Sequence, residues 1–185
     1  MKSLRTVLPT CAIGVLLLAA TAVAQDADKA KLIEIEKAFV ANPDPGPQSA
    51  AVFKQYIYEG TVSQLTPMGR VGTLPKARLV EMASAPDPSD PDAKSAQKLT
   101  DFRVDIYGST ALVSYKQTNV DTGHKDPALN TTSHITCLDT FVKSNGAWYI
   151  VGDACSSTTP ISQARWDAAK KAMAQAPKDV QQAYH

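Results

Sequence analysis

The sequence predicts an α+β domain, and three observations support that prediction. A helical apolar pattern follows residue 24, two β-hairpins in series occupy residues 99–157, and the composition shifts to Ala, Lys and Gln after Pro160. We therefore expect an N-terminal helix packed on a largely antiparallel sheet, followed by a C-terminal helical tail.

The first 24 residues have the pattern of a secretory signal peptide. Lys2 and Arg5 precede an apolar run over residues 12–20, and Ala22-Val23-Ala24 supplies a small-x-small cleavage pattern. A membrane anchor is the rival interpretation, but a hydrocarbon core needs about 20 apolar residues and this run is shorter. We expect cleavage after Ala24, a periplasmic or secreted location, and no membrane association of the mature chain.

The charge balance of the mature chain argues against nucleic acid as a partner. Without Lys2 and Arg5, the 19 basic side chains of the chain fall to 17, against 18 acidic ones. The sequence contains no basic run either, so a polyanion surface is not the expected target. The remaining length suits one domain, over residues 25–160, with a helical tail over 161–185.

Apolar spacing predicts the first helix of the mature chain. Asp28 is positioned to cap it, and Leu32, Ile35 and Phe39 recur at helical intervals. The helix is expected to end near Asn42, where a cluster of Pro and Gly begins.

Shorter elements follow. Residues 49–57 carry a second helical pattern, residues 59–65 become extended, and Thr66-Pro67-Met68-Gly69 turns the chain. Pro75 then opens a third short helix.

Two polar segments and a terminal helix complete the chain. Residues 85–96 are rich in Pro, Asp and Ser and predict an exposed loop. Residues 121–132 are either a long strand connection or a flap over a pocket mouth. A terminal helix with one narrow apolar stripe is expected to fray after Pro177. The stripe is Trp166, Ala169 and Met173.

Gly108-Ser109 defines the first hairpin, because a Gly-first pair between alternating strands predicts a two-residue type II′ turn. Pairing outward from this turn places six apolar residues on one face, and a slip of one residue would move them all to the other. The pairs are Ile106 with Ala111, Val104 with Val113, and Phe102 with Tyr115.

The second hairpin leaves two registers open. Its strands are residues 133–143 and 147–154. A two-residue turn at Asn145-Gly146 would point Cys137 and Cys155 to opposite faces. A three-residue loop that includes Ser144 would place the two cysteines on one face, with Cys137 opposite Asp153.

An exported chain usually pairs its cysteines, so we expect a Cys137–Cys155 disulfide. A catalytic thiol and a thiolate metal site are the weaker alternatives. The sequence has no CxxC, and neither His124 nor His134 falls at a metal-ligand spacing from the cysteines. We expect no metal and no cofactor.

The order of elements resembles the nuclear transport factor 2-like superfamily, in particular its SnoaL-like branch. The segments that carry the resemblance are YIYEGTVSQLTPMGRVGTLPK (56–76), FRVDIYGSTALVS (102–114) and DTFVKSNGAWYIVG (139–152). It spans about residues 29–157. The resemblance implies a curved, mixed or antiparallel sheet wrapped around the N-terminal helix as a cone, with a pocket at the open end.

Isomerase chemistry is not implied. In the ketosteroid isomerase branch a carboxylate base stands immediately before the Pro-x-Gly turn, where this chain has Thr66. A threonine hydroxyl is not a proton base near neutral pH. That branch also places a tyrosine donor on the first helix, where the nearest residue here is Phe39. We therefore lean against an enzyme.

Four residues are candidates for proton transfer in the implied pocket. In the three-residue register Asp139 and Asp153 share a face, where one carboxylate would raise the pKa of the other. The alternative is that both are solvated or accept hydrogen bonds. Glu59 opens the first strand and His134 opens the strand that carries Cys137, although both positions equally suit exposed side chains. The expected pocket-lining residues are Phe39, Tyr115, Phe141 and Tyr149.

Three functions remain open. The chain binds a small apolar molecule without catalysis, or it is a SnoaL-like or isomerase-like enzyme that uses pocket carboxylates, or it is a dimerisation module whose outer sheet face contacts a second copy. We rank binding first.

Overall fold

The computed structural model describes residues 12–84 and 90–184 of the 185-residue chain. Lys2 and Arg5 of the predicted signal peptide, and residues 85–89 of the predicted exposed loop, lie outside the described residues. Within the described part, no helix has the length and apolar character that crossing a bilayer requires.

The first helix, α1 (Ala12–Val40), starts earlier than the apolar spacing predicts and runs through the expected cleavage site after Ala24. Its later turns pack against the sheet. Leu32 and Ile35 are fully buried there, as their spacing predicts.

Asp28 is not the N-cap that the sequence predicts. It lies inside α1, where the backbone amides that a cap would satisfy already belong to the helix. Its carboxylate instead accepts hydrogen bonds from Lys143 Nζ at 2.7 Å and from Trp148 Nε1 at 2.9 Å. Asp28 therefore ties α1 to the second hairpin, and the hydrogen bond from Lys143 lowers the pKa of its carboxyl.

The two short helices lie close to their predicted positions. The helix α2 (Pro47–Tyr56) begins with proline, whose missing N–H is no loss at a helix start. The helix α3 (Lys76–Met82) begins directly after Pro75.

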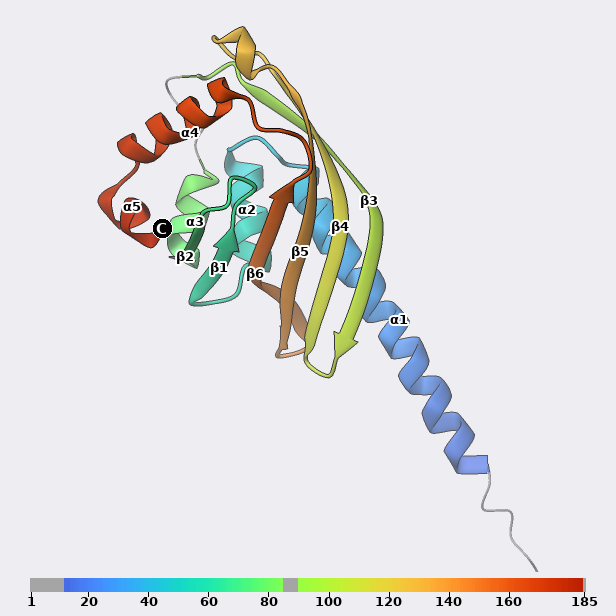
Figure 1. The fold of residues 1–185 in the computed structure, drawn as a ribbon. Coiled ribbons are helices and arrows are strands. Elements are labelled where there is room, and N and C mark those ends of the chain that lie inside the picture. The colour runs from blue at the N-terminus through green and yellow to red at the C-terminus, as the bar shows by residue number, and fades with distance from the viewer. Residues whose placement is uncertain (1–11, 85–89, 185) are drawn as a thin grey trace, which may run out of the picture.

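Six strands form one curved, mixed sheet in the order β2-β1-β6-β5-β4-β3 (Figure 1). All neighbouring strands are antiparallel except β1 and β6, which are parallel. The strands are β1 (Thr61–Leu65), β2 (Val71–Pro75), β3 (Lys94–Tyr107), β4 (Thr110–Thr122), β5 (Thr132–Ser144) and β6 (Ala147–Ser157).

The β1–β2 hairpin was only half predicted. The strand β1 begins at Thr61 rather than at Glu59, and the turn at residues 66–69 is confirmed. The second strand, β2, is missing from the sequence prediction. Its five residues include Gly72 and Pro75, which are both poor strand formers, and only pairing with β1 makes the segment extended.

The first long hairpin matches its predicted register. Gly108 has a φ of 62° while Ser109 has no positive φ, as a type II′ turn requires, and Ile106 pairs with Ala111. A bulge at Asp101, whose φ is 57°, shifts the register further along. The strand β3 begins at Lys94, so the predicted loop over residues 85–96 ends earlier than expected.

The second long hairpin combines features of both expected registers. Asn145 and Gly146 have φ values of 51° and 81°, so the turn has two residues and the three-residue loop is wrong. The strand β6 then carries Val151 as one extra residue, and this bulge moves the ladder by one position. Cys137 therefore lies directly opposite Cys155, and the predicted disulfide is confirmed.

The C-terminal tail forms two helices, α4 (Gln163–Gln175) and α5 (Lys178–Ala183). The expected fraying after Pro177 is wrong, because Val180 is buried at 3 % exposure and Tyr184 pairs with Gly72 of β2. Burial of the Val180 side chain stabilises the docking of this short segment on the rest of the domain.

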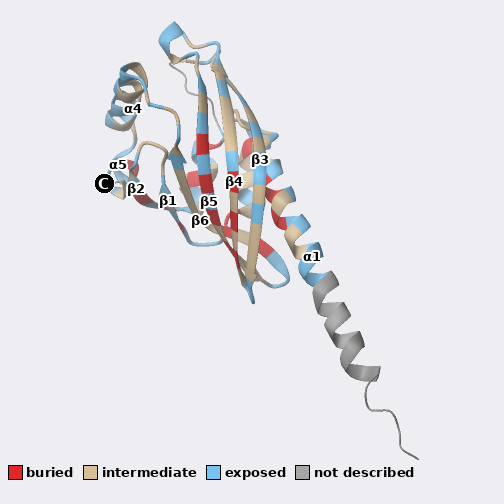
Figure 2. Ribbon diagram, turned by 45° about the vertical axis from the view of Figure 1, so that its right-hand side comes forward, coloured by how far each residue is buried: buried red, intermediate tan, exposed pale blue. Residues whose placement is uncertain are grey.

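The core lies between α1 and the inner face of the sheet. Buried positions are concentrated midway along the long strands and on α1 where it passes behind them (Figure 2). Ala111, Val113 and Phe141 are fully buried. The last residues of β4 and the first residues of β5 extend beyond this core and are partly or fully exposed. Space for a ligand is therefore expected at those ends.

Candidate functional site

A cavity of about 890 Å³ lies between the ends of the long strands, the β1–β2 turn and the C-terminal helices. This volume is within the range of small-molecule sites. Figure 1 shows α4 and α5 beside the β1–β2 hairpin, on the side of the sheet away from β3. The apolar part of the lining includes Met68, Met82, Leu129, Ile135, Met173 and Val180.

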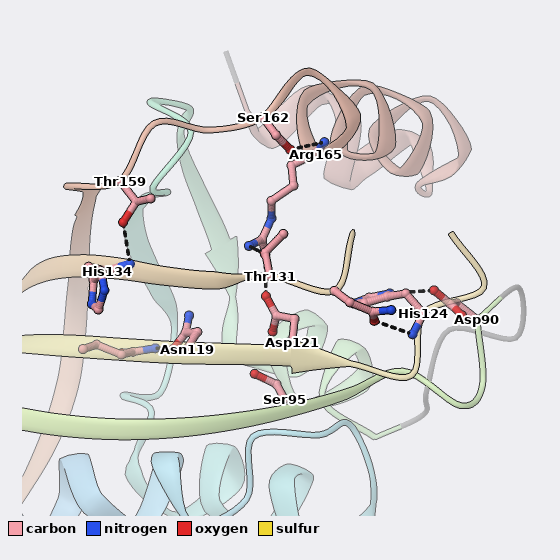
Figure 3. Close-up of polar contacts among 12 residues, drawn as sticks. Asp90, Ser95, Asn119, Asp121, His124, Thr131, His134, Thr159, Ser162 and Arg165 are labelled. Carbon is pink, nitrogen blue, oxygen red and sulfur yellow. Dashed lines mark hydrogen bonds and ion pairs between the residues drawn. The ribbon is translucent and has the colours of Figure 1, made fainter. Parts of the chain in front are cut away.

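Arg165 connects α4 to the end of β4. Figure 3 shows its side chain extending from the helix to the strand, where Nη2 lies 2.7 Å from Asp121 Oδ2 and Nη1 lies 2.6 Å from Thr131 Oγ1. Ser162 caps α4 by accepting a hydrogen bond from the Arg165 backbone amide. The helix is therefore held over the cavity by a charged pair whose Asp121 side chain is only 12 % exposed.

A second polar contact orders the β4–β5 connection. His124 Nδ1 lies 2.7 Å from Asp90 Oδ2, and Asn130 accepts a hydrogen bond from the His124 backbone amide (Figure 3). The hydrogen bond from His124 lowers the pKa of the Asp90 carboxyl. The connection spans residues 123–131 and contains the 3-10 helix η1 (Pro127–Leu129), and His124, Leu129 and Thr131 line the cavity.

The C-terminal residues complete the cavity wall. Tyr184 lines the cavity and its hydroxyl donates a short hydrogen bond to Gln64 Oε1. Only glycine fits at position 72, because a Cβ there would lie 2.5 Å from the Tyr184 ring. Gln64 in turn pairs in register with Asp153 of β6, so the wall leads toward the interior of the cone.

Three carboxyl groups gather inside the cone, and none of them is among the residues that line the cavity. Glu36 and Asp139 are 2 % and 3 % exposed, and Asp153 is half-buried directly opposite Asp139. The Tyr115 hydroxyl donates to Asp139 Oδ2 at 3.0 Å. One oxygen of Glu36 and one of Asp139 have no hydrogen-bond partner among the described residues. A proton on either carboxyl would let that group donate a hydrogen bond to the other.

Burial favours the protonated form of these acids. It raises the pKa of Glu36 to about 7, with the Asp153 charge adding to the effect, and raises the pKa of Asp139 well above its ordinary range. Burial also raises the pKa of Asp153 and of the Tyr115 hydroxyl. A carboxyl whose pKa lies near neutral pH, as that of Glu36 does, is able to act as a general acid and base.

The disulfide forms one edge of this carboxyl cluster. Cys137 and Cys155 are bonded at 2.05 Å, and Asp153 Oδ1 lies 3.2 Å from the Cys155 sulfur. These three residues are the one set of possible metal ligands found among the described residues. With the two sulfurs bonded to each other, no thiolate is present to bind a metal there.

The structure brings together two of the four predicted proton-transfer residues. Asp139 and Asp153 lie opposite each other on the inner face. Glu59 pairs with Lys76 at the surface and is 85 % exposed. His134 is exposed on the outer face, with Nδ1 3.1 Å from the Thr118 hydroxyl.

None of the four predicted pocket-lining residues is among those that line the cavity. Tyr115 and Phe141 are buried inside the cone, and Phe39 packs against Phe53 with ring centres 5.1 Å apart. Tyr149 lies on the other face of β6, paired with Val142 and against the ring of Tyr58, because the turn at Asn145-Gly146 has two residues instead of the three that the other register requires. Ile150 takes the inner position beside Phe141.

Sequence reasoning missed Glu36, Arg165 and Tyr184. A signal for Glu36 was present, since it lies one helical turn after Leu32 on the apolar stripe that continues to Phe39. Acidic side chains are rarely fully buried unless they are paired, so an acid on such a stripe indicates a buried polar partner. No comparable signal marks the other two, whose roles depend on contacts with distant strands.

No protein-family model and no curated protein matches this chain. Solved structures do match it. An NTF2-like superfamily protein from Salmonella enterica has a TM-score of 0.57 at 17 % identity, over 75 % of this chain and 96 % of that one. An NTF2-like family protein from Streptomyces avermitilis, provisionally assigned as a dehydratase, has a TM-score of 0.56 at 16 % identity, over 74 % and 99 %. A third match, from Prochlorococcus, has a TM-score of 0.53 at 17 % identity, over 72 % and 94 %.

The chain therefore has the nuclear transport factor 2-like fold, and the predicted α+β cone is confirmed. Its placement in the SnoaL-like branch stays a prediction. The outer sheet face, expected to bind a second copy, exposes Leu138 at 44 % and Val120 at 40 %. Dimerisation through that face also stays a prediction.

Proposed function

We propose that this chain binds a small apolar molecule in the cavity beneath α4 and α5. The observation that carries the proposal is the cavity itself, whose volume of about 890 Å³ is bounded by methionine, leucine, isoleucine and valine side chains. The ion pair between Arg165 and Asp121 holds the covering helix in place. Such a site excludes water from an apolar ligand while its rim stays polar.

Binding of a neutral fluorescent probe, N-phenyl-1-naphthylamine, tests this proposal. The probe is expected to gain fluorescence with the wild-type protein and to bind at least about tenfold more weakly to Met173→Asp, because a charge would enter the apolar lining. Leu138→Asp is the matched control, since Leu138 lies on the outer face. Equal probe binding by the two variants would overturn the proposal.

A second candidate function is acid–base chemistry by the carboxyl cluster. The observation that favours it is the adjacency of Glu36, Asp139 and Asp153, together with a Glu36 pKa of about 7. Asp153 borders Gln64, which bonds to the cavity-lining Tyr184, so a ligand in the cavity has a hydrogen-bonded route toward these acids. Proton removal beside a carbonyl is the reaction class this arrangement suits.

Deuterium incorporation from heavy water into 2-decanone tests the second candidate. If it is correct, the wild-type protein accelerates exchange at the carbons beside the carbonyl, and Glu36→Gln and Asp139→Asn both lose the acceleration. Glu34→Gln is the control, because Glu34 lies on the exposed side of α1 and pairs with Lys31. No acceleration over buffer by the wild type would leave binding alone.

We also propose that the chain is exported and cleaved after Ala24. The Cys137–Cys155 bridge supports this, since disulfides persist in oxidising compartments. Sequencing the N-terminus of the protein recovered from the periplasm or medium is expected to give Gln25 as the first residue. A protein that retains Met1 would contradict it.

A further inference from the structure

Arg70 is a cation in the cavity lining that has no ion pair among the described residues. It is half-buried and follows Gly69 in the β1–β2 turn. The other basic side chains of the lining do have partners: Arg165 bonds to Asp121, and Lys94 lies 3.8 Å from Asp44. A half-buried arginine with no opposing charge would stabilise an anionic group bound next to it.

The acidic residues of the same lining are already engaged. Asp121 accepts from Arg165, and Asp90 accepts from His124 and from the Lys125 backbone amide. Asp44 accepts from the backbone amide of Ser95 at 2.8 Å. Within the described part of the chain, the lining therefore offers a free cation to a ligand, whereas its anions are held by the protein.

The backbone around Arg70 is fixed before any ligand arrives. The Arg70 amide donates to Thr66 Oγ1 at 3.2 Å, and the Thr66 amide donates to the Arg70 carbonyl at 2.9 Å. Pro67 and Met68 of the same turn also line the cavity. The cation consequently stands beside apolar surface on a backbone that loses little freedom on binding.

We propose that Arg70 binds the carboxylate of an amphipathic ligand, an aliphatic monocarboxylic acid whose chain lies along the apolar lining. This inference rests on the proposed binding function and adds the chemical class of the ligand. The guanidinium of arginine suits a carboxylate because its planar N–H groups match the two oxygens.

Competition by three ligands of equal chain length tests the inference on the full-length protein. Decanoate, 1-decanol and decylamine are each titrated against bound N-phenyl-1-naphthylamine. Decanoate is expected to displace the probe at about a tenfold lower concentration than decanol, and Arg70→Gln is expected to remove that preference while decanol affinity stays unchanged. Arg103→Gln is the matched control, because Arg103 is 75 % exposed and pairs with Asp105.

The outcomes separate the two proposals. Decanol displacing the probe as well as decanoate, or decylamine displacing it best, would overturn the role of Arg70 and leave apolar binding intact. A wild-type preference that persists in Arg70→Gln would overturn that role in the same way. A wild-type protein that does not bind the probe would overturn the proposed function together with the inference.

Discussion

The interior of the cone and the cavity beneath α4 both contain carboxyl groups, yet the two regions treat them differently. Inside, Glu36 and Asp139 are almost fully buried and form no ion pair with any residue that the structure describes, and burial raises the pKa of each. At the cavity, Asp121 and Asp90 are charged partners of Arg165 and His124. The presence or absence of a cationic neighbour, rather than the residue type, therefore decides whether a carboxyl favours its protonated form or forms an ion pair.

The pH dependence of stability provides the largest test of this contrast. The unfolded Glu36 ionises near 4.5, whereas the folded residue keeps its proton to about pH 7. The unfolded state therefore binds fewer protons between these values, and stability falls as the pH rises through that window and levels off above it. For Glu36 alone the loss is about 3 kcal/mol.

Urea unfolding of the wild type and Glu36→Gln between pH 4 and pH 8 measures this effect. The variant is expected to lose the part of the slope that Glu36 contributes, because glutamine resembles the protonated acid and does not titrate. Asp139 and Asp153, whose pKa values burial also raises, keep their own contributions. A wild-type stability that is flat or rises across this range would contradict a protonated Glu36. Glu34→Gln should retain the wild-type slope, since Glu34 is exposed.

The docking of the C-terminal tail gives a smaller test, on the cavity side. Gly72→Ala is expected to cost about 2 kcal/mol, because the new Cβ would meet the Tyr184 ring at 2.5 Å and the Ala183 carbonyl at 2.6 Å. Released from β2, the segment around Lys178 should become sensitive to trypsin while the sheet survives. Gly152→Ala is the control, since its Cβ would lie 3.5 Å from Thr140, an ordinary contact. Equal trypsin sensitivity of both variants would refute the docking.

Arg165→Gln is the mildest change and concerns the helix over the cavity. It leaves Asp121 without its charged partner, at a cost of about 1 kcal/mol. Amide exchange should quicken in α4 and leave β5 unaffected, and neutral probe binding should weaken. Faster exchange throughout the sheet would indicate that the two regions are one cooperative unit rather than two.

Local sequence was sufficient for the first long hairpin and for the presence of the disulfide. A Gly-first turn and an alternating pattern sufficed for the register of β3 and β4 between the turn and the bulge at Asp101. The Val151 bulge was beyond local reasoning, because an extra residue in one strand is stabilised by the sheet around it. The strand β2, with Gly72 as its second residue, was missed for the same reason.

The candidate site was predictable only where one strand pair contained it. Asp139 and Asp153 lie on one such pair, and only the three-residue register predicted that they share a face. In the structure they share it because the Val151 bulge follows a two-residue turn. Glu36 joins them from α1, and Tyr184 and Arg165 come from the tail, so their positions depend on how distant segments pack. Contacts of that kind leave no periodic trace in the sequence.

The contact between Tyr184 and Gly72 also bears on the order in which the parts of the fold assemble. The carboxyl cluster, the disulfide and the six strands all lie between Glu36 and Ser157, whereas Tyr184 belongs to the segment after them. The sheet can therefore close around α1 while the last wall of the cavity is still undocked. A chain at that stage holds a folded cone that is open at the side where Tyr184 belongs.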